Sequence, residues 1–370
     1  MVRGQSRRRW AAVAGGVALL CALPSIDAAL PASVPRMSAA QLRTRILDSA
    51  ARPYAGYAES DASFGLPPLS GFSDMAALLD GVTRMRVWQA TPDRWRVDVL
   101  SDAGERDTYQ TPQASYLWDS ASELLTEVIG HYPVRLPRAA DLVPPALALR
   151  LLREAGPHAR LSVIAPRRVA GIAAAGLRVS PGDPASTIAR IDVWADPASG
   201  LPLLVEIFGR GGGRPALETQ FLQVSPWRPV QAILTPQRGA GTAFTQATAS
   251  DLSGALGTLG PVILPVSLAG RPRVAAPPGF DQVGLYGRGL ATFAVLELSG
   301  GTGLSLIAGA RADGGTAMRV RRGTGVIVTT SLITAVLVHP SHASGTFVLA
   351  GFVNRSVLQR AAAQLAAEPW

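Results

Sequence analysis

The stretch RRVAGIAAAGLRVSPGDPASTIARIDVWADPASGLPLLVEIF, residues 167–208, predicts three consecutive β-strands. These strands are expected at Ala170–Val179, Ile188–Ala195 and Leu201–Phe208. Between the last two lies DPASG, residues 196–200, with Pro early in the turn and Gly where a positive φ is needed. In the middle strand Ile191, Val193 and Ala195 share one face. Such period-two alternation predicts antiparallel strands with one face against a core.

The region before this stretch predicts helices that lie on a larger sheet. Ser38 can cap a helix over Met37–Arg52, whose apolar residues recur along one stripe. Further helices are predicted at Ser73–Leu79 and Pro145–Ala155. The other expected strands are Tyr54–Ser60, Thr83–Gln89, Arg94–Leu100, Glu105–Gln110, Ser115–Asp119, Glu123–Ile129, Leu161–Ala165 and Leu217–Val224, with a tail at Ala232–Leu234.

The last third of the chain predicts a linker and a second unit. Residues 251–278 are rich in Gly, Pro and small apolar residues, which is typical of a linker. The segment 279–367 predicts a small α+β domain that ends in a helix at Ser356–Ala367. A hairpin turn is predicted at the glycine run 300–303. The strands expected around it are Leu285–Leu298, Leu304–Ala310, Val326–Thr330, Ile333–His339 and Thr346–Val353.

The basic charge of the chain is spread along the sequence. The 370 residues carry a formal net charge of +9, and all 35 basic residues are Arg. Only Arg7–Arg9 form a run, and many other arginines alternate with apolar residues. This spacing favours a solvated basic face over a nucleic-acid site, and it leaves affinity for anionic lipid headgroups open.

The first 28 residues have the three parts of a secretory signal. Arg3 and Arg7–Arg9 form a positive end, Ala11–Leu23 an apolar stretch, and Pro24–Ala28 a breaker followed by small residues. The apolar stretch is shorter than the roughly 18 residues of a spanning helix. The alternative is an N-terminal anchor that is not cut. Cys21 is the only cysteine, so a chain without the signal has no intrachain disulfide.

Residues for catalysis or metal binding are not grouped in this sequence. His339 and His342 form an H-x-x-H beside Pro340, but no carboxylate or thiol accompanies them as a further ligand. The sequence contains no G-x-S-x-G elbow and no P-loop, and its carboxylates are dispersed. We therefore expect a protein that is not an enzyme, with no catalytic residues, no bound metal and no cofactor.

The first half of the chain resembles a family of envelope half-barrel proteins, the LolA, LppX and RseB type. Two shorter motifs carry part of this likeness, PDRWRVD at residues 92–98 and YLWD at residues 116–119. The remainder lies in the opening stretch, at Gly171, Leu177, Val179, Pro181, Asp183, Pro184, Ile188, Arg190 to Trp194, Asp196, Gly200 to Leu203, Val205 and Glu206.

The end of the chain resembles the C-terminal domain of the RseB (MucB) family. The segment YGRGLATFAV, residues 286–295, has the spacing of a strand in that domain, with Arg288 where the family has an acid. The segment FVLAGFVNRSVLQRAA, residues 347–362, resembles its last strand and helix, with Phe352 in place of an acid and Asn354 in place of Pro. LolA-type carriers have no such second domain.

The resemblance implies an α+β fold with two domains. Residues 37–250 are expected to form a curved antiparallel half-barrel sheet covered by short helices, and 279–367 the small C-terminal domain. It also implies a hydrophobic cavity that binds lipid or lipoprotein acyl chains, and a C-terminal domain that binds an anti-sigma factor through Tyr286, Arg288 and Phe293. The residues expected to line the cavity are Met85, Val87, Trp95, Val97, Val99, Leu117, Val193, Val205 and Ile207.

Three hypotheses of function follow from these observations. The first is a secreted regulator in the periplasm or cell envelope that responds to lipid or mislocalised lipoprotein and protects an anti-sigma factor from proteolysis. The second is a carrier that moves lipids or lipoproteins between membranes. The third is a structural envelope protein with an ordinary closed core, which would bind no lipid.

Overall fold

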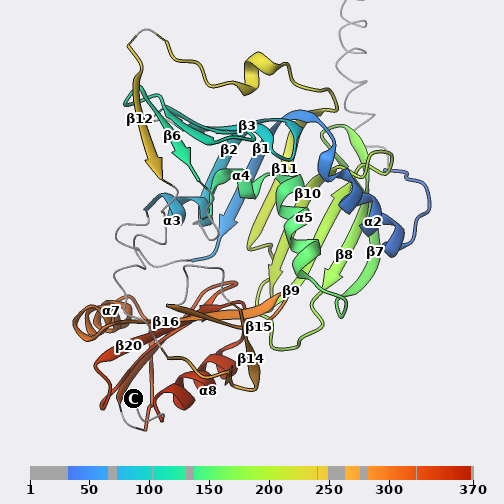
Figure 1. Cartoon of the computed structure of the whole chain (residues 1–370). Coiled ribbons are helices and arrows are strands. Elements are labelled where there is room, and N and C mark those ends of the chain that lie inside the picture. The colour runs from blue at the N-terminus through green and yellow to red at the C-terminus, as the bar shows by residue number, and fades with distance from the viewer. Residues whose placement is uncertain are drawn as a thin grey trace, which may run out of the picture.

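The computed structural model describes residues 32–65, 73–101, 104–130, 137–239, 241–248, 263–275, 282–321 and 323–367. The predicted signal segment, residues 1–28, lies outside these ranges. The described chain forms two sheets, one of twelve strands and one of eight (Figure 1).

The twelve-stranded sheet is open and almost wholly antiparallel. Its strands lie in the order β12-β6-β5-β4-β3-β2-β1-β11-β10-β9-β8-β7, and only the outer pair of β12 and β6 is parallel. The strands are β1 Tyr54–Ser63, β2 Asp80–Thr91, β3 Arg94–Ser101, β4 Gly104–Gln110, β5 Ser115–Asp119, β6 Leu124–Ile129, β7 Arg160–Val169, β8 Ile172–Ser180, β9 Ile188–Ala195, β10 Pro202–Gly209, β11 Leu217–Ser225 and β12 Ala243–Thr248.

The turn between β9 and β10 forms as its sequence predicts. The Asp196 carboxylate accepts hydrogen bonds from the backbone N–H groups of Ala198 at 3.0 Å and Ser199 at 3.1 Å. Gly200 has a φ of +76°, a conformation that costs glycine little. The turn fixes the register in which Val193 lies opposite Val205, so both point to the same face.

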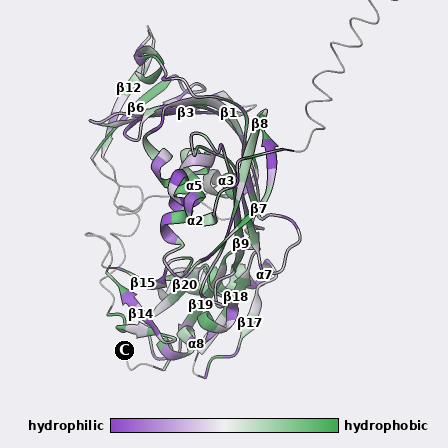
Figure 2. Ribbon diagram, turned by 90° about the vertical axis from the view of Figure 1, so that its right-hand side faces the viewer, coloured by the Kyte–Doolittle hydropathy of each residue, from purple (hydrophilic) through white to green (hydrophobic). Residues whose placement is uncertain are grey.

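Helices cover the concave face of this sheet. They are α2 Ala39–Asp48, the 3₁₀ turn η1 Ser49–Ala51, α3 Ser73–Leu79, α4 Ala139–Leu142 and α5 Pro144–Glu154. Ser38 and Gln41 cap α2 reciprocally, so its predicted start is confirmed. The apolar stripe of α2 buries Leu42 and Ile46. Figure 2 shows α2 and α5 in the hollow around which the large sheet curves.

The second sheet has the order β13-β14-β15-β16-β20-β19-β18-β17. Its buried side chains form a core of their own, built mainly from β15, β16, β19, β20 and α8. Its elements are β13 Ser267–Leu268, β14 Arg271–Val274, β15 Val283–Arg288, β16 Ala291–Ser299, α7 Gly300–Ala312, β17 Thr316–Met318, β18 Gly323–Thr329, β19 Thr334–Pro340, β20 Gly345–Gly351 and α8 Arg355–Leu365.

The predicted linker is wrong over the part that the structure describes. Residues 263–275 contain the hairpin of β13 and β14, and Leu264 and Leu268 are buried in the second core. The low charge of this segment therefore reflects packing against β15 and α8. The rest of the predicted linker, residues 251–262 and 276–278, lies outside the described residues.

Four local predictions also differ from the structure. The glycine run at 300 opens helix α7, and the strand expected at Leu304–Ala310 lies inside this helix. The single strand expected at Leu285–Leu298 is a hairpin of β15 and β16. The tail at Ala232–Leu234 lies in the 3₁₀ turn η2 Gln231–Leu234. The fold class, α+β with a curved half-barrel sheet under short helices and a second α+β unit, is confirmed.

Candidate functional site

The residues predicted to line a cavity share the concave face of the large sheet. Met85 lies opposite Val99, Val87 opposite Val97, and Val193 opposite Val205, so the strand registers place these side chains on one surface. Most of this surface is closed. Six of the nine have an exposed fraction of 5% or less, namely Met85, Val87, Val97, Val193, Val205 and Ile207.

The helices close the face. Helix α5 packs on β10 and β11, α2 on β7 and β8, and α4 on β3. The guanidinium Nη2 of Arg43 in α2 donates to the carbonyl of Leu152 in α5 at 3.2 Å, which ties the two helices together. The hydroxyl of Thr219, buried in β11, donates to the carbonyl of Leu142 in α4 at 2.6 Å. The concave face thus has a roof held by few polar contacts.

Three of the predicted residues remain partly exposed. Trp95 and Val99 on β3 pack against the edge of the core, and Leu117 on β5 is half-buried. They lie on the half of the sheet away from α2 and α5. The two pockets described below are lined by other residues. An apolar ligand on the concave face would therefore enter beside β3 and β5, where the roof is incomplete.

The opposite, outer face of the sheet is polar. Over β8 to β10, Arg178 binds Asp192 with two hydrogen bonds of 2.7 Å, and Arg167 binds Glu206 at 2.6 Å. The Arg167 guanidinium also lies 4.3 Å from the centre of the Trp194 ring. The arginines over β8 to β10 are thus paired with acids on the outer face of the sheet.

A buried acidic cluster lies on the same outer face, across β3 and β4. Oxygens of Asp98, Glu105 and Asp107 lie within 4.8 Å of one another. Arg96 donates to Asp98 at 2.5 Å and to Asp107 at 2.8 Å, and its guanidinium lies 4.8 Å from the centre of the Tyr109 ring. Because Arg96 supplies the counter-charge, we do not assign a metal site to this cluster. Burial raises the pKa of Asp98 to about 8 and that of Asp107 to about 6.

The loop between β8 and β9 joins the two sheets. The Ser186 hydroxyl donates to the carbonyl of Leu290 at 2.6 Å, and the backbone N–H of Thr187 donates to that of Phe352 at 3.1 Å. Arg210, at the end of β10, donates to the Ser186 carbonyl at 2.5 Å. The loop is therefore hydrogen-bonded to the first sheet on one side and to the second sheet on the other.

The three residues predicted to bind a partner have different environments. Tyr286 and Phe293 are buried and stack with ring centres 5.3 Å apart, so they hold β15 against β16 inside the core. The Tyr286 hydroxyl donates to the carbonyl of Pro265 at 2.7 Å. Arg288 alone is exposed. Of the three, only Arg288 can contact a partner directly in this conformation.

Arg288 lines a pocket of about 460 Å³ at the junction of the sheets. Two further arginines contribute, Arg271 from β14 and Arg360 from α8. Arg271 is mostly buried and bonds Asp183, in the β8–β9 loop, at 2.8 Å. Arg288 and Arg360 have no acidic partner within 4.0 Å among the described residues. The pocket can therefore bind an anionic group between the two sheets.

Sequence reasoning did not find the other residues of this pocket. Arg271 lies in the segment predicted as a linker, and Arg360 lies on a helix whose sequence only indicated a buried stripe. Asp183 was noted only for its resemblance to the half-barrel family. Because these residues come from three distant segments, no spacing within the sequence could have grouped them. Arg271 and Arg273, two charges in an otherwise neutral segment, were the available signal.

Comparison with known proteins gives likenesses of structure only. No protein-family model matches this chain, and no curated protein matches it. Among the described residues, no helix is both long enough and apolar enough to cross a membrane.

Solved structures similar to this chain include the complex of MucA and MucB from Pseudomonas aeruginosa. It is 18% identical and covers 88% of this chain and 96% of that chain, with a TM-score of 0.49. Another structure of MucB in complex with MucA(peri) has a TM-score of 0.48 at 18% identity, over 88% of this chain and 97% of that one. A LolA superfamily protein from Nitrosomonas europaea is 10% identical over 54% of this chain and 99% of its own, with a TM-score of 0.25. The names on these structures, MucB and LolA, are those of the two families that the sequence resembles.

Proposed function

We propose that this protein is a non-enzymatic regulator of the cell envelope, similar in role to RseB. Its concave face binds lipid or lipoprotein acyl chains, and its second sheet binds the extracytoplasmic segment of an anti-sigma factor. The observation that supports this proposal is the β8–β9 loop, which is hydrogen-bonded to both sheets through Ser186 and Thr187. A ligand that moves the helices on the first sheet can thereby change the surface offered at the second.

The acyl-chain site is the concave face under the helical roof. A chain that enters beside Trp95, Val99 and Leu117 displaces apolar contacts of α4 and α5 and replaces them with its own. Each buried CH₂ contributes about 0.8 kcal/mol, so two acyl chains can offset the lost helix packing without a polar anchor. The few hydrogen bonds that hold the roof make this exchange feasible.

The partner site is the pocket that contains Arg288. Its three arginines, one of them neutralised by Asp183, favour a partner segment that carries carboxylates. The class of partner rests on the family resemblance, which implies an anti-sigma factor, and two of the similar solved structures hold MucB in complex with MucA. Arg288 stands where the family has an acid, so the partner of this protein is expected to carry the opposite charge at that contact.

Acyl binding is tested by native mass spectrometry of the protein after incubation with a diacyl phosphatidylglycerol. The wild type should retain lipid. Leu117→Asp should lose it, because the charge lies at the proposed entrance, whereas Val82→Asp, an exposed position on β2, should retain it. No retained lipid in the wild type would refute acyl binding and favour a closed structural protein.

Partner binding is tested by affinity capture from the native envelope. A single-pass anti-sigma factor should be recovered with the wild type and lost with Arg288→Glu. Arg319→Glu, which changes an exposed arginine just after β17, should leave recovery unchanged. Transfer of labelled lipid between vesicles, without such a partner, would instead support a LolA-like carrier.

A further inference from the structure

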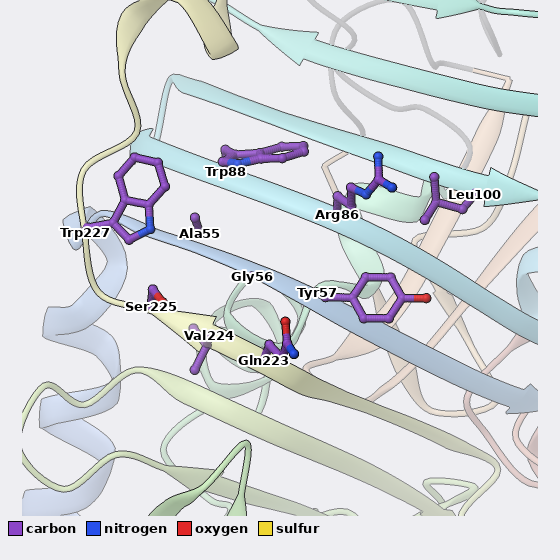
Figure 3. A pocket seen from close by; sticks show the side chains of 10 residues that line it. All are labelled: Ala55, Gly56, Tyr57, Arg86, Trp88, Leu100, Gln223, Val224, Ser225 and Trp227. Atoms are coloured by element: carbon purple, nitrogen blue, oxygen red, sulfur yellow. The ribbon is translucent and has the colours of Figure 1, made fainter.

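A second pocket lies on the outer face of the large sheet, away from the helical roof. It has a volume of about 490 Å³. Ala55 and Gly56 of β1 form its floor, and Figure 3 shows Trp88 and Trp227 standing on either side of Ala55, with Arg86 farther along the same strand as Trp88. Large side chains around a floor of small ones leave the space open. The pocket takes no part in the function proposed above.

One wall of the pocket belongs to a segment that we call the strap, residues 226–239. The strap leaves β11, crosses the outer face through η2 and leads toward β12, on the side of the sheet away from α5 (Figure 1). Leu234 anchors it with an exposed fraction of 1%, and Arg94 of β3 donates to Gln231 at 2.7 Å. The strap is thus fixed to the sheet at η2.

The strap exposes apolar side chains next to cations. Trp227, which lines the pocket, is 44% exposed, and Val230, three residues farther along the strap, is 59% exposed. Arg228, between them, is exposed, as is Arg86 in the pocket. Among the described residues, neither arginine has an acidic partner within 4.0 Å. Elsewhere on the outer face, the arginines over β8 to β10 are paired with acids.

This combination fits the surface of an anionic bilayer. Tryptophan prefers the level of the lipid headgroups, where its ring is apolar on one side and its N–H stays wet. Arginine side chains beside it attract lipid phosphates. Exposed apolar side chains and unpaired cations on one segment match the two layers of such a bilayer, the anionic headgroups and the apolar region beneath them.

We propose that the strap and the adjoining pocket form a docking surface for an anionic lipid bilayer. Trp227 and Val230 insert at the headgroup level, and Arg86 and Arg228 bind headgroup phosphates, one of which enters the pocket. The acyl-binding concave face lies on the other side of the sheet. The docked protein therefore keeps its helical roof turned away from the membrane that holds it.

Co-sedimentation with vesicles tests this surface, using equal parts of phosphatidylglycerol and phosphatidylcholine against phosphatidylcholine alone. The wild type should bind the anionic vesicles and be released by salt. Arg86→Glu with Arg228→Glu should weaken binding at least 25-fold, about fivefold for each cation. The control Arg319→Glu with Arg321→Glu makes the same change in net charge on the second sheet and should weaken binding far less. Equal loss in both variants would show a general charge effect and overturn the proposal.

Insertion of Trp227 has its own measurement. Brominated phosphatidylglycerol should quench part of the tryptophan fluorescence of the wild type, and Trp227→Phe should remove that part. Undiminished quenching in Trp227→Phe would refute insertion by the strap. Leu117→Asp should leave vesicle binding intact, and Arg86→Glu with Arg228→Glu should still retain lipid in native mass spectrometry. The two sites can therefore fail separately.

Discussion

The buried carboxyl of Asp98 should make the protein more stable at pH 6 than at pH 8. Asp98 has an exposed fraction of 0%, and burial raises its pKa in the folded state to about 8, against 3.8 for the unfolded chain. Between these values the folded protein holds one more proton than the unfolded chain, so stability falls as the pH rises. From pH 6 to pH 8 the loss amounts to about 2 kcal/mol.

Urea unfolding of the wild type and of Asp98→Asn, at pH values from 6 to 8, measures this contribution. Asn imitates the protonated carboxyl, so the variant should lack about 2 kcal/mol of the pH dependence and should be the more stable protein at pH 8. Asp93→Asn is the control, because Asp93 is exposed and its pKa is lowered by the Thr91 hydroxyl. An equal pH dependence in wild type and Asp98→Asn would refute the reasoning and mean that Arg96 keeps Asp98 ionised.

Three further substitutions test the packing. Gly209→Ala should destabilise the protein by roughly 1–3 kcal/mol, because a Cβ would lie 2.2 Å from the Ser331 carbonyl oxygen, whereas Gly211→Ala meets no atom within 4 Å and should not, both measured by urea unfolding. Leu152→Ala should cost about 2–5 kcal/mol by loosening α5 on the sheet, and an unchanged melting temperature would contradict the roof that we describe. Thr219→Val should cost roughly 1–3 kcal/mol, because the carbonyl of α4 that it binds would lose its donor in a buried site, and calorimetry measures the loss.

The first sheet was predictable because its signals are local. Alternation places Val193 and Val205 on one face, and the Asp196–Gly200 turn sets their register without help from distant residues. The strands at Ser115–Asp119 and Ile188–Ala195 were predicted with the bounds that they have. The signals for these strands lie within the strands and their turns, so the sequence was sufficient to predict them.

The second sheet was harder because its decisive contacts are not local. Three glycines in the four residues 300–303 argue against a helix, yet α7 begins there, because Gly303 lies against Thr346 with no room for a Cβ. Close packing of the helix on β20 outweighs its poor intrinsic propensity. The same holds for Leu264, whose burial depends on β15 and α8 rather than on its neighbours in the chain.

The candidate site also combines features that local sequence patterns predict with features that depend on distant contacts. Alternation correctly predicted the face of the sheet on which Met85 and Val97 lie. Their degree of burial depends on how closely α4 and α5 approach that face, and the periodicity of the sequence does not specify this distance. Likewise Tyr286, Arg288 and Phe293 belong to one sequence motif. Because Tyr286 and Phe293 stack in the core, only Arg288 of this motif is offered to a partner, and the sequence alone does not reveal this. Whether the concave face opens for a ligand remains a prediction for the lipid experiment.

The junction between the sheets determines how an opening of the concave face could affect the second sheet. Several of its hydrogen bonds are made by the backbone, as from Thr187 to Phe352 and from Asn354 to Ala185, and Thr187 also binds Leu332 through its hydroxyl. Backbone bonds of this kind resist hinge motion, because breaking them would leave polar groups unpaired near buried residues. A displaced helix would therefore act on the second sheet by shifting the β8–β9 loop and the Arg271 ion pair with Asp183, not by separating two loosely tethered domains.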